Sequence, residues 1–486
     1  MQQGGVHHQA AALLAAAGDT FALAVDWIAV SFSPAVAAVL EQLLRAWSAL
    51  AVPLLRGAVT LCMAMSVMVL AEKVFLGMVN AAANVLRRKE TGRSVDPAVV
   101  RDEEAGGGSA AAFPMVLVQI PMYNEREKNK VYQLSIGAAC RLMWPADRLI
   151  VQVLDDSTDA AIKELVRAEC DRWARSGVDV RYEARGYRAG HKAADTVPLL
   201  LENPGLALVQ ARWEFVNADE CLLTRMQEMS MDYHFKVEQQ AGSSLCSFFG
   251  YNGSAGVWRR QVIEESGGWD DRTTAEDMDL ALRAALLGWE FVYIGTIKVK
   301  SELPSSLKAY RSQQHRWSCG PALLFKKMFW EILAAKEISI WKKFYIVYNF
   351  FIARRIVSTF FTTLLNSVGT PRRSLILLIP WIAFENAMAL HRFKVILIGL
   401  LEAGRANEWI VTHKSGNIGQ RLKSVTHTDS LKHRFHGLEL MMGAFLLVSG
   451  CYAYLYGHGY FYMFALPQSI MYFAIGFEFL GVSVCS

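Results

Sequence analysis

The apolar runs MVLVQI (residues 115–120) and LIVQVL (residues 149–154) decide the fold of this chain. Each run has the length of a buried strand, and each ends at a polar segment, PMYNE at 121–125 and DDS at 155–157. The residues between them, from Val131 to Trp144, have the composition and length of a helix. A strand, a helix and a second strand in this order are typical of a parallel sheet.

The alternation of strand and helix patterns continues downstream. Apolar residues recur at helical spacing between Ile162 and Trp173, and further apolar segments of strand type span 178–182 and 206–210. The sequence therefore predicts an α/β fold with a mostly parallel sheet that is covered by helices on both faces. Such sheets bind ligands beyond the carboxyl ends of their strands, where Asp155 lies.

Composition indicates a protein with a membrane part. Hydrophobic residues make up 53% of the 486 residues, and the mean hydropathy is +0.21. The formal net charge is only +5 and is spread along the chain, so we expect no nucleic-acid partner. The eight cysteines show neither a C-x-x-C pair nor a metal-ligand spacing, which favours thiols in the core.

Three apolar runs, 57–79, 438–456 and 460–484, are of the length that crosses a bilayer. Two further runs, 344–365 and 375–390, contain charged residues. Charge at bilayer depth is costly, so these two are either spans or interfacial, half-buried helices. Basic residues are denser after the first run than before it, which places the central domain in the cytosol.

The chain divides into seven segments. A charged, Gly-rich stretch that ends at Gly106–Ser109 marks a linker before the α/β domain. The expected segments are an N-terminal amphipathic segment (1–50), a transmembrane helix (51–89), the linker (90–112), the α/β domain (113–335), interfacial or transmembrane helices (336–403), a polar loop (404–437) and two transmembrane helices (438–486).

Asp277 closes the turn TAED (274–277) and falls in the first turn of a helix predicted over 276–287. A carboxylate at this place is suited to take a proton from an attacking hydroxyl group. The alternative is that it only compensates the charge of the helix N-terminus, a purpose that Asp279 already serves.

The motif QQHRW (313–317) places Gln313, Arg316 and Trp317 on one face of a helix. A guanidinium group recognises phosphate with a fork of donors, and an indole ring can cover a sugar. An amphipathic helix with a core tryptophan would give the same spacing, so the motif alone leaves both interpretations open.

Long strings in a fixed order connect these motifs. They are VLVQIPMYNERE (116–127), QVLDDSTD (152–159), ALVQARWEFVNADE (207–220), FFGYNGSAG (248–256), TAEDMDLA (274–281) and QQHRWSCGP (313–321). On these strings the chain resembles the plant cellulose synthase-like A family of glycosyltransferase family two. The resemblance implies a GT-A-type domain over 113–335 that makes a β-1,4-mannan or glucomannan backbone, with inversion, from GDP-mannose and with GDP-glucose as a second donor.

The same resemblance implies the surroundings of the reaction. A divalent cation, Mg or Mn, is the expected cofactor, and the growing β-mannan chain is the acceptor. The implied location is the Golgi membrane, which the protein crosses several times. Assembly with copies of itself or with related synthases is a further expected partnership.

Individual residues receive roles from the resemblance. Asp277 is the expected catalytic base. Asp155 and Asp156 could instead form an Asx turn that caps the next helix. Lys192 could be a solvated lysine, and Asn252 also belongs to a glycosylation sequon. The donor and its diphosphate are expected to contact Asp155, Asp156, Lys192, Gln313 and Arg316, and the acceptor to contact Trp317, Asn252 and Gly253.

One working part of the family pattern is missing. Relatives carry an aspartate-x-aspartate that binds the cation, on a strand between the counterpart of Lys192 and that of Leu206. Here the interval contains a single aspartate, Asp195, which cannot replace the pair. By comparison with the family pattern, a strand–helix unit of about forty residues is absent. A second shortening follows Arg355, and an insertion of about three residues lies at 128–130.

These irregularities leave open a misassembled gene model, an alternative transcript or a decaying paralogue. We therefore expect greatly reduced or no sugar transfer, with a non-catalytic partner of active synthases as the alternative function. A transporter and a lipid-linked mannosyltransferase are less favoured, because the strand–helix domain and the Q-x-x-R-W motif are typical of polymer-making enzymes.

Overall fold

The computed structural model describes residues 34–90, 113–122, 131–142, 144–155, 157, 159–184, 197–270, 272–357, 378–402, 436–456 and 460–480. Asp156, Lys192 and Asp195 therefore lie outside the described residues, as do the second shortening after Arg355 and the insertion at 128–130.

The first sheet contains β1 (Val116–Met122), β2 (Leu149–Asp155) and β3 (Asp179–Ala184), paired in parallel in the order β1-β2-β3. Its helices cover the sheet with apolar side chains such as Ile136 and Val166, which are fully buried. Asp159 caps the second helix by accepting a hydrogen bond from the amide of Ala161 at 3.0 Å. The helices are α4 (Val131–Cys140), η4 (Ala146–Arg148) and α5 (Ala160–Arg175).

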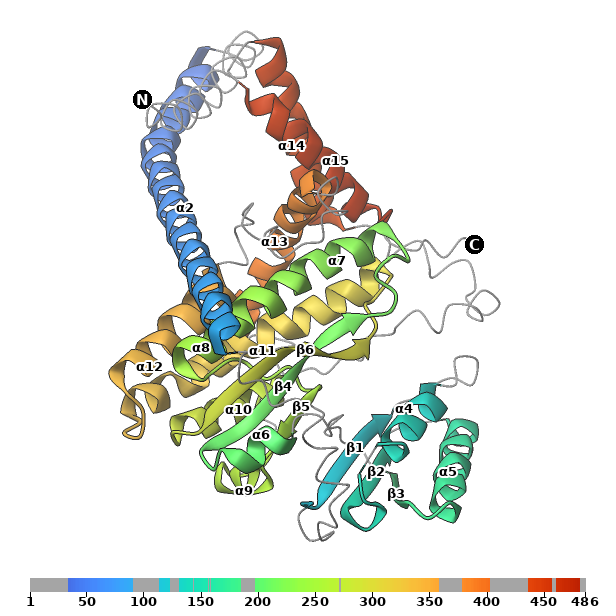
Figure 1. Cartoon of the computed structure of the whole chain (residues 1–486). Helices are drawn as coiled ribbons and strands as arrows, with labels where there is room; N and C mark the ends of the chain where they lie inside the picture. Colours follow the sequence, from blue (N-terminus) through green and yellow to red (C-terminus); the bar gives the residue numbers. More distant parts are fainter. Residues whose placement is uncertain are drawn as a thin grey trace.

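The second sheet has the order β5-β4-β6, from β4 (Leu206–Phe215), β5 (Gly256–Trp258) and β6 (Glu290–Ser301). The strand β4 pairs in parallel with β6 and antiparallel with β5. Parallel pairing predominates, as the sequence predicts, but the described strands form two sheets where we expected one (Figure 1). The interval 185–196 between β3 and α6 (Val197–Glu202) is too short for the additional strand and crossover helix that would join the sheets.

A nearly continuous helical segment lies over the second sheet and consists of α7 (Leu222–Tyr233), the π-helix η6 (His234–Gln239) and α8 (Gln240–Cys246). A π-helical turn inside an α-helix is often found at a functional site. After β5 the chain forms α9 (Arg260–Glu265) and α10 (Glu276–Leu286), and after β6 it forms the long α11 (Leu307–Ala334). The predicted helices at Asp277 and at the Q-x-x-R-W motif are thus both present.

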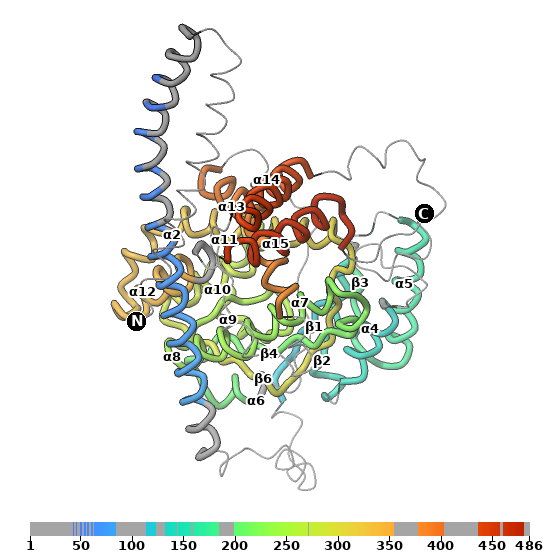
Figure 2. Tube along the Cα trace, turned by 90° about the horizontal axis from the view of Figure 1, so that it is seen from above, coloured from blue at the N-terminus to red at the C-terminus, as the bar shows by residue number. Residues whose placement is uncertain are grey.

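The helix α2 (Pro34–Glu90) has 57 residues and runs along the edge of the molecule (Figures 1 and 2). Its exposed side chains between Leu61 and Met78 are mostly apolar, whereas Glu72 and Lys73 are buried against the domain. The amide group of Asn349 donates a hydrogen bond to Glu72, and the ammonium group of Lys73 lies 4.2 Å from the ring centroid of Tyr233.

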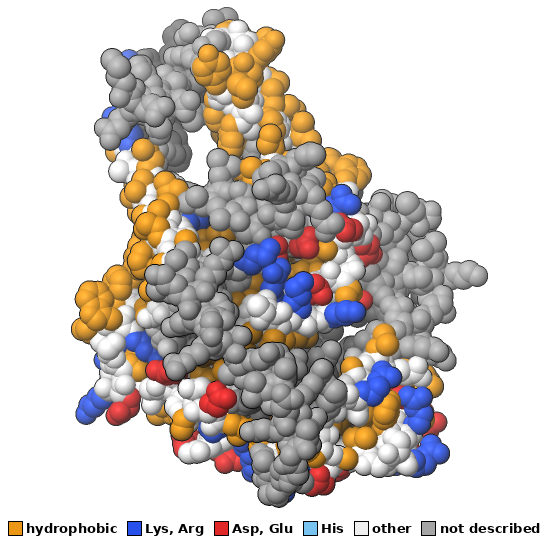
Figure 3. All heavy atoms as spheres, in the orientation of Figure 1, with side chains coloured by type: hydrophobic (Ala, Val, Ile, Leu, Met, Phe, Trp, Pro, Cys, Tyr) orange, Lys and Arg blue, Asp and Glu red, His pale blue; other side chains and the backbone are white. Residues whose placement is uncertain are grey.

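Two helical segments in the described part are long and apolar enough to cross a membrane, Met63–Ala83 of α2 and Gly437–Leu455. A shorter apolar helix, Phe461–Gly476, packs against the second of them. Figure 3 shows hydrophobic side chains gathered on these elements, away from the mixed surface of the sheets. The remaining helices are α12 (Ile340–Phe344), the π-helix η7 (Tyr345–Val357), α13 (Leu378–Leu401), α14 (Gly437–Leu455) and α15 (Phe461–Gly476).

The helix α13 contains the charged residue that made its sequence ambiguous. Glu385 is buried and accepts a hydrogen bond from Arg392 at 2.6 Å and from Ser230 at 3.0 Å. Arg392 also donates to the hydroxyl group of Tyr310 and to Gln314 on α11, both at 3.0 Å. This helix is therefore half buried against the domain, and its two buried charges, Glu385 and Arg392, neutralise each other.

Candidate active site

Asp277 lies in the first turn of α10, as predicted, and faces the loop that contains Asn252 and Gly253. A Cβ atom at Gly253, whose φ is +72°, would lie 2.7 Å from Oδ2 of Asp277. The other oxygen, Oδ1, accepts a hydrogen bond from the amide of Met278 at 2.7 Å. The loop and the carboxylate thus approach each other closely only because residue 253 has no side chain.

Tyr251 is a further neighbour of Asp277 that sequence analysis did not single out. Its side chain is buried, and burial together with the charge of Asp277 raises the pKa of its hydroxyl group above the usual value. Tyr251 belongs to the string FFGYNGSAG, but the motif does not reveal which of its residues lies near the carboxylate.

The helix α11 brings the Q-x-x-R-W motif to the same place. A Cβ atom at Gly320 would lie 2.9 Å from Cβ of Ala275 and 3.0 Å from Oγ1 of Thr274, so α11 touches the TAED turn there. Gly320 follows Arg316 and Trp317 by one helical turn, on the same face. The structure therefore places the Q-x-x-R-W helix, the Asp277 turn and the Gly253 loop against one another.

Gln313 and Trp317 differ in their surroundings. Gln313 is buried, at 8% exposure. The indole ring of Trp317 lies with its centroid 6.5 Å from that of Trp213 on β4, and the two ring planes are inclined by 36°. Gln314, on the other side of α11, accepts a hydrogen bond from Arg392 and so has a structural contact.

Asn252 takes part in a buried network of amides. Its backbone amide donates to Oε1 of Gln210 at 3.2 Å, and its Oδ1 accepts from Nε2 of Gln239 at 3.1 Å. Gln210 donates in turn to Gln239 at 2.6 Å. Within the described residues, Nδ2 of Asn252 is buried and has no hydrogen-bond partner, although a buried donor without a partner is costly.

Asp279 has another role than simple compensation of a helix end. Its side chain is fully buried between Arg272, at 2.7 Å, and Arg283, at 2.8 Å. Arg283 also donates to the carbonyl groups of Ser266 and Gly268, and Arg272 reaches Glu331 on α11 at 3.3 Å. This ion-pair cluster fastens the loop before Asp277 to both α10 and α11.

Asp155 ends β2, as predicted, but its carboxylate is fully buried. Its Oδ1 accepts a hydrogen bond from the amide of Ser157, and its Oδ2 accepts one from the hydroxyl group of Tyr182, both at 2.9 Å. The first contact has the geometry of the Asx turn that was the alternative interpretation, while the next helix is capped by Asp159. The side chain of Asp155 is therefore occupied by protein partners.

The divalent cation of the family does not fit the residues that are described. No group of three or more His, Cys, Asp or Glu side chains that could hold a metal ion occurs among them. Asp155 has both oxygens engaged, and Asp279 lies between two arginines. A hard cation prefers several oxygen ligands, which these isolated carboxylates do not provide.

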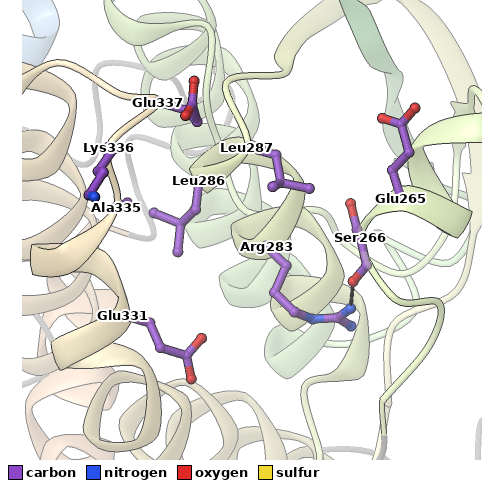
Figure 4. A pocket seen from close by; sticks show the side chains of 9 residues that line it. All are labelled: Glu265, Ser266, Arg283, Leu286, Leu287, Glu331, Ala335, Lys336 and Glu337. Atoms are coloured by element: carbon purple, nitrogen blue, oxygen red, sulfur yellow. Dashed lines mark hydrogen bonds between the residues drawn. The ribbon is translucent and has the colours of Figure 1, made fainter.

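A surface hollow lies at the opposite end of α10 from Asp277 (Figure 4). Its volume is about 380 Å³, and Arg283, Glu331 and Lys336 are among the residues that line it. Arg283 and Glu331 belong to the Asp279 ion-pair cluster. The hollow therefore borders this cluster and not the surroundings of Asp277.

Comparison with known proteins identifies relatives over most of the chain. It is 63% identical to the probable glucomannan 4-beta-mannosyltransferase 6 of Oryza sativa subsp. japonica, with 93% of this chain and 90% of the relative covered. It is 48% identical to glucomannan 4-beta-mannosyltransferase 9 of Arabidopsis thaliana, with 90% of this chain and 93% of the relative covered.

Two further comparisons concern parts of the chain. Residues 191–391 match the family described as glycosyl transferase family group 2. A mannosyltransferase from Pyrobaculum calidifontis, solved in complex with GDP-Man and Mn2+, is 16% identical and has a TM-score of 0.39, with 69% of this chain and 100% of that chain covered.

The alignment with the Oryza sativa relative extends over 522 positions, whereas this chain has 486 residues. The relative therefore contains residues that this chain lacks. The identities and the shared length nevertheless define the family: the chain belongs to the plant cellulose synthase-like A family of glucomannan 4-beta-mannosyltransferases, which are enzymes of glycosyltransferase family two.

Proposed function

We propose that this chain has the architecture of an inverting glycosyltransferase that extends a β-1,4-mannan or glucomannan backbone from GDP-mannose, with GDP-glucose as a second donor. The observation that supports this proposal is the convergence of three segments at Asp277. The Gly253 loop, the TAED turn and the Q-x-x-R-W helix approach one another at glycines where a side chain would clash.

In the proposed reaction Asp277 takes the proton from the acceptor hydroxyl group as its oxygen attacks the anomeric carbon. The bond between that carbon and the diphosphate breaks on the opposite face, and GDP leaves with the bonding electrons. One carboxylate suffices because no covalent intermediate forms. The N-terminus of α10 stabilises the negative charge of this carboxylate.

The donor side of the proposal rests on Arg316 and Gln313 of α11. A guanidinium group keeps its charge at all accessible pH values and recognises phosphate oxygens with several donors. Asp155 would define the end of β2 next to the nucleotide through its backbone, since its carboxylate has internal partners. The contributions of Asp156 and Lys192 follow from the family pattern alone.

The acceptor side rests on Trp317, Asn252 and Gly253. Trp317 would stack on the sugar nearest the donor, because the apolar face of a pyranose matches an aromatic ring. The buried Nδ2 of Asn252 has no partner in the described part of the chain and lies in the loop next to Asp277, where an acceptor hydroxyl group would accept its hydrogen bond.

We further propose that transfer by the chain as written is greatly reduced or absent. The aspartate-x-aspartate segment is missing from the sequence, and the described carboxylates do not replace it. Stabilisation of a leaving phosphate by a cation is usually worth several kcal/mol in the transition state. The second candidate function follows from this deficit: a non-catalytic paralogue or truncated gene product that assembles with active synthases.

The proposed location is the Golgi membrane, with several crossings of the lipid bilayer. Two helical segments of sufficient length and apolarity support attachment to a membrane. The Golgi assignment and assembly with copies of the chain or with related synthases are proposals from the family.

Incorporation of labelled mannose from GDP-mannose by membranes that contain this chain tests the proposal. We expect label in β-mannanase-sensitive polymer only after the aspartate-x-aspartate segment of a relative is inserted, and we expect Asp277→Asn to abolish it. Label made by the unmodified chain and lost in Asp277→Asn would refute the claim that the missing segment is disabling. A restored chain whose labelled product survives Asp277→Asn would refute the assignment of the base.

A further inference from the structure

Trp213 is an aromatic neighbour of Trp317. Its indole is only partly buried, and it lies between Trp317, at 6.5 Å, and Phe235 of the π-helix, at 5.5 Å between ring centroids. The planes of Trp213 and Trp317 are inclined by 36°, so the two rings do not pack edge to face. Edge-to-face packing, at 63°, is instead the relation between Trp213 and Phe235.

A break in the second sheet lies next to Trp213. The register between β4 and β6 shifts between Ala211 and Arg212, where the partner on β6 changes from Ile294 to Lys298. The unmatched residues, 295–297, belong to β6, and irregularities of this kind are common beside active sites. Trp213 follows this break directly and remains paired with β6, opposite Val299.

A cluster of charged groups begins at Arg212, the residue that precedes Trp213 on β4. Arg212 and Lys236 both bind the carboxylate of Asp232, the lysine at 2.6 Å. The Asp232 side chain is only 4% exposed, whereas that of Lys236 is 38% exposed. The buried Nε–H of Arg212 has no hydrogen-bond partner among the described residues, and a buried donor in that state is costly unless a ligand or water accepts from it.

An aromatic face next to a fixed pair of charged groups is the chemistry that recognises a pyranose. The C–H groups of the sugar cover the indole, and its hydroxyl groups exchange hydrogen bonds with carboxylate and guanidinium. We propose that Trp213, with Arg212 and Asp232, forms a second acceptor-sugar subsite, which binds the residue of the glycan next to the one on Trp317. This inference rests on the proposed function, because it needs a glycan acceptor at Trp317.

The test is the affinity of the full-length chain in detergent for manno-oligosaccharides of two to six residues, alongside its affinity for GDP. Tryptophan fluorescence or calorimetry measures both without requiring transfer. We expect Trp213→Ala to weaken mannohexaose binding about tenfold and to remove most of the affinity gained between mannobiose and mannotetraose. Trp213→Phe should retain most of that gain, and GDP affinity should not change.

Trp330→Ala is the matched control. This tryptophan lies on α11, like Trp317, but it is 74% exposed and distant from the Q-x-x-R-W motif. Suppose that Trp213→Ala keeps the full gain of affinity with glycan length while Trp317→Ala loses mannobiose binding. That result would overturn the subsite and leave the proposed function intact. A parallel loss of GDP affinity and melting temperature in both Trp213 variants would assign Trp213 to the core and also overturn it. Absence of manno-oligosaccharide binding by the unmodified chain would overturn the subsite and the acceptor assignment together.

Discussion

Gly253 lies against Asp277 so closely that a single added carbon would come within 2.7 Å of Oδ2. The contact joins the FFGYNG loop to the proposed base, although the two residues belong to separate motifs. It also means that the position of the carboxylate depends on a backbone with φ of +72°, a conformation that glycine adopts without strain.

Substitution of Gly253 by alanine should displace Asp277. We expect Gly253→Ala to destabilise the protein by about 1–3 kcal/mol and to abolish transfer in the chain with the restored segment. Gly268→Ala is the control, since Gly268 has a φ of +73° but no atom near its added Cβ. Melting in detergent and mannose incorporation measure the two effects, and equal activity in both variants would contradict the importance of the contact.

Asp279 should be a determinant of stability. Its replacement by alanine leaves Arg272 and Arg283 without their buried partner, which costs about 3–5 kcal/mol. Asp270→Ala, which removes an exposed carboxylate 3.7 Å from Arg272, should change stability by at most about 1 kcal/mol. Thermal unfolding compares them, and similar melting temperatures for the two variants would show that the Asp279 cluster is dispensable.

The pair Glu385 and Arg392 should be coupled. Arg392→Met alone leaves a buried carboxylate near Ser230, and Glu385→Leu alone leaves a buried guanidinium, so each should cost about 3–5 kcal/mol. The double variant should be more stable than either single one, because neither charge is then left alone. A double-mutant cycle of unfolding measurements gives the coupling energy, and additive losses would refute the interaction.

Two buried thiols should make stability fall at alkaline pH. Burial raises the pKa of Cys140 to about 11 and that of Cys170 to about 12, from a usual value of 9.0. The folded chain keeps these protons while the unfolded chain loses them, so their contribution is complete below pH 9 and is lost as the pH rises towards 11 and 12. Melting temperature should fall more steeply above pH 9 in the parent than in Cys140→Ala/Cys170→Ala, and parallel curves would contradict this.

Local patterns in the sequence predicted most of the individual elements. Alternating apolar segments located β2 and the helix that follows it, and the TAED turn located the start of α10. The division into two sheets was not predicted, because pairing between β1 and a distant strand depends on edges that meet only in three dimensions. The short connection between β3 and β4 was visible in the sequence as a missing strand–helix unit.

The position of a site residue was predictable where it follows from the residue's own element. Asp277 and the Q-x-x-R-W residues lie where their motifs placed them. Tyr251 and Trp213 were missed, since their nearness to Asp277 and Trp317 arises from contacts between separate elements. The carboxylate of Asp155 was expected to face a ligand, and its hydrogen bond with Tyr182 depends on the neighbouring strand.

The burial of Glu72 and Lys73 has a consequence for biogenesis. A helix that enters the bilayer with both side chains uncovered bears a penalty of about 2.5–3.5 kcal/mol for each charge near its centre. Their covering residues, Tyr233 and Asn349, are synthesised more than a hundred residues later. If α2 crosses the membrane, its stable insertion is therefore completed only when the domain docks on it. The helix and the folded domain would then mature as one unit.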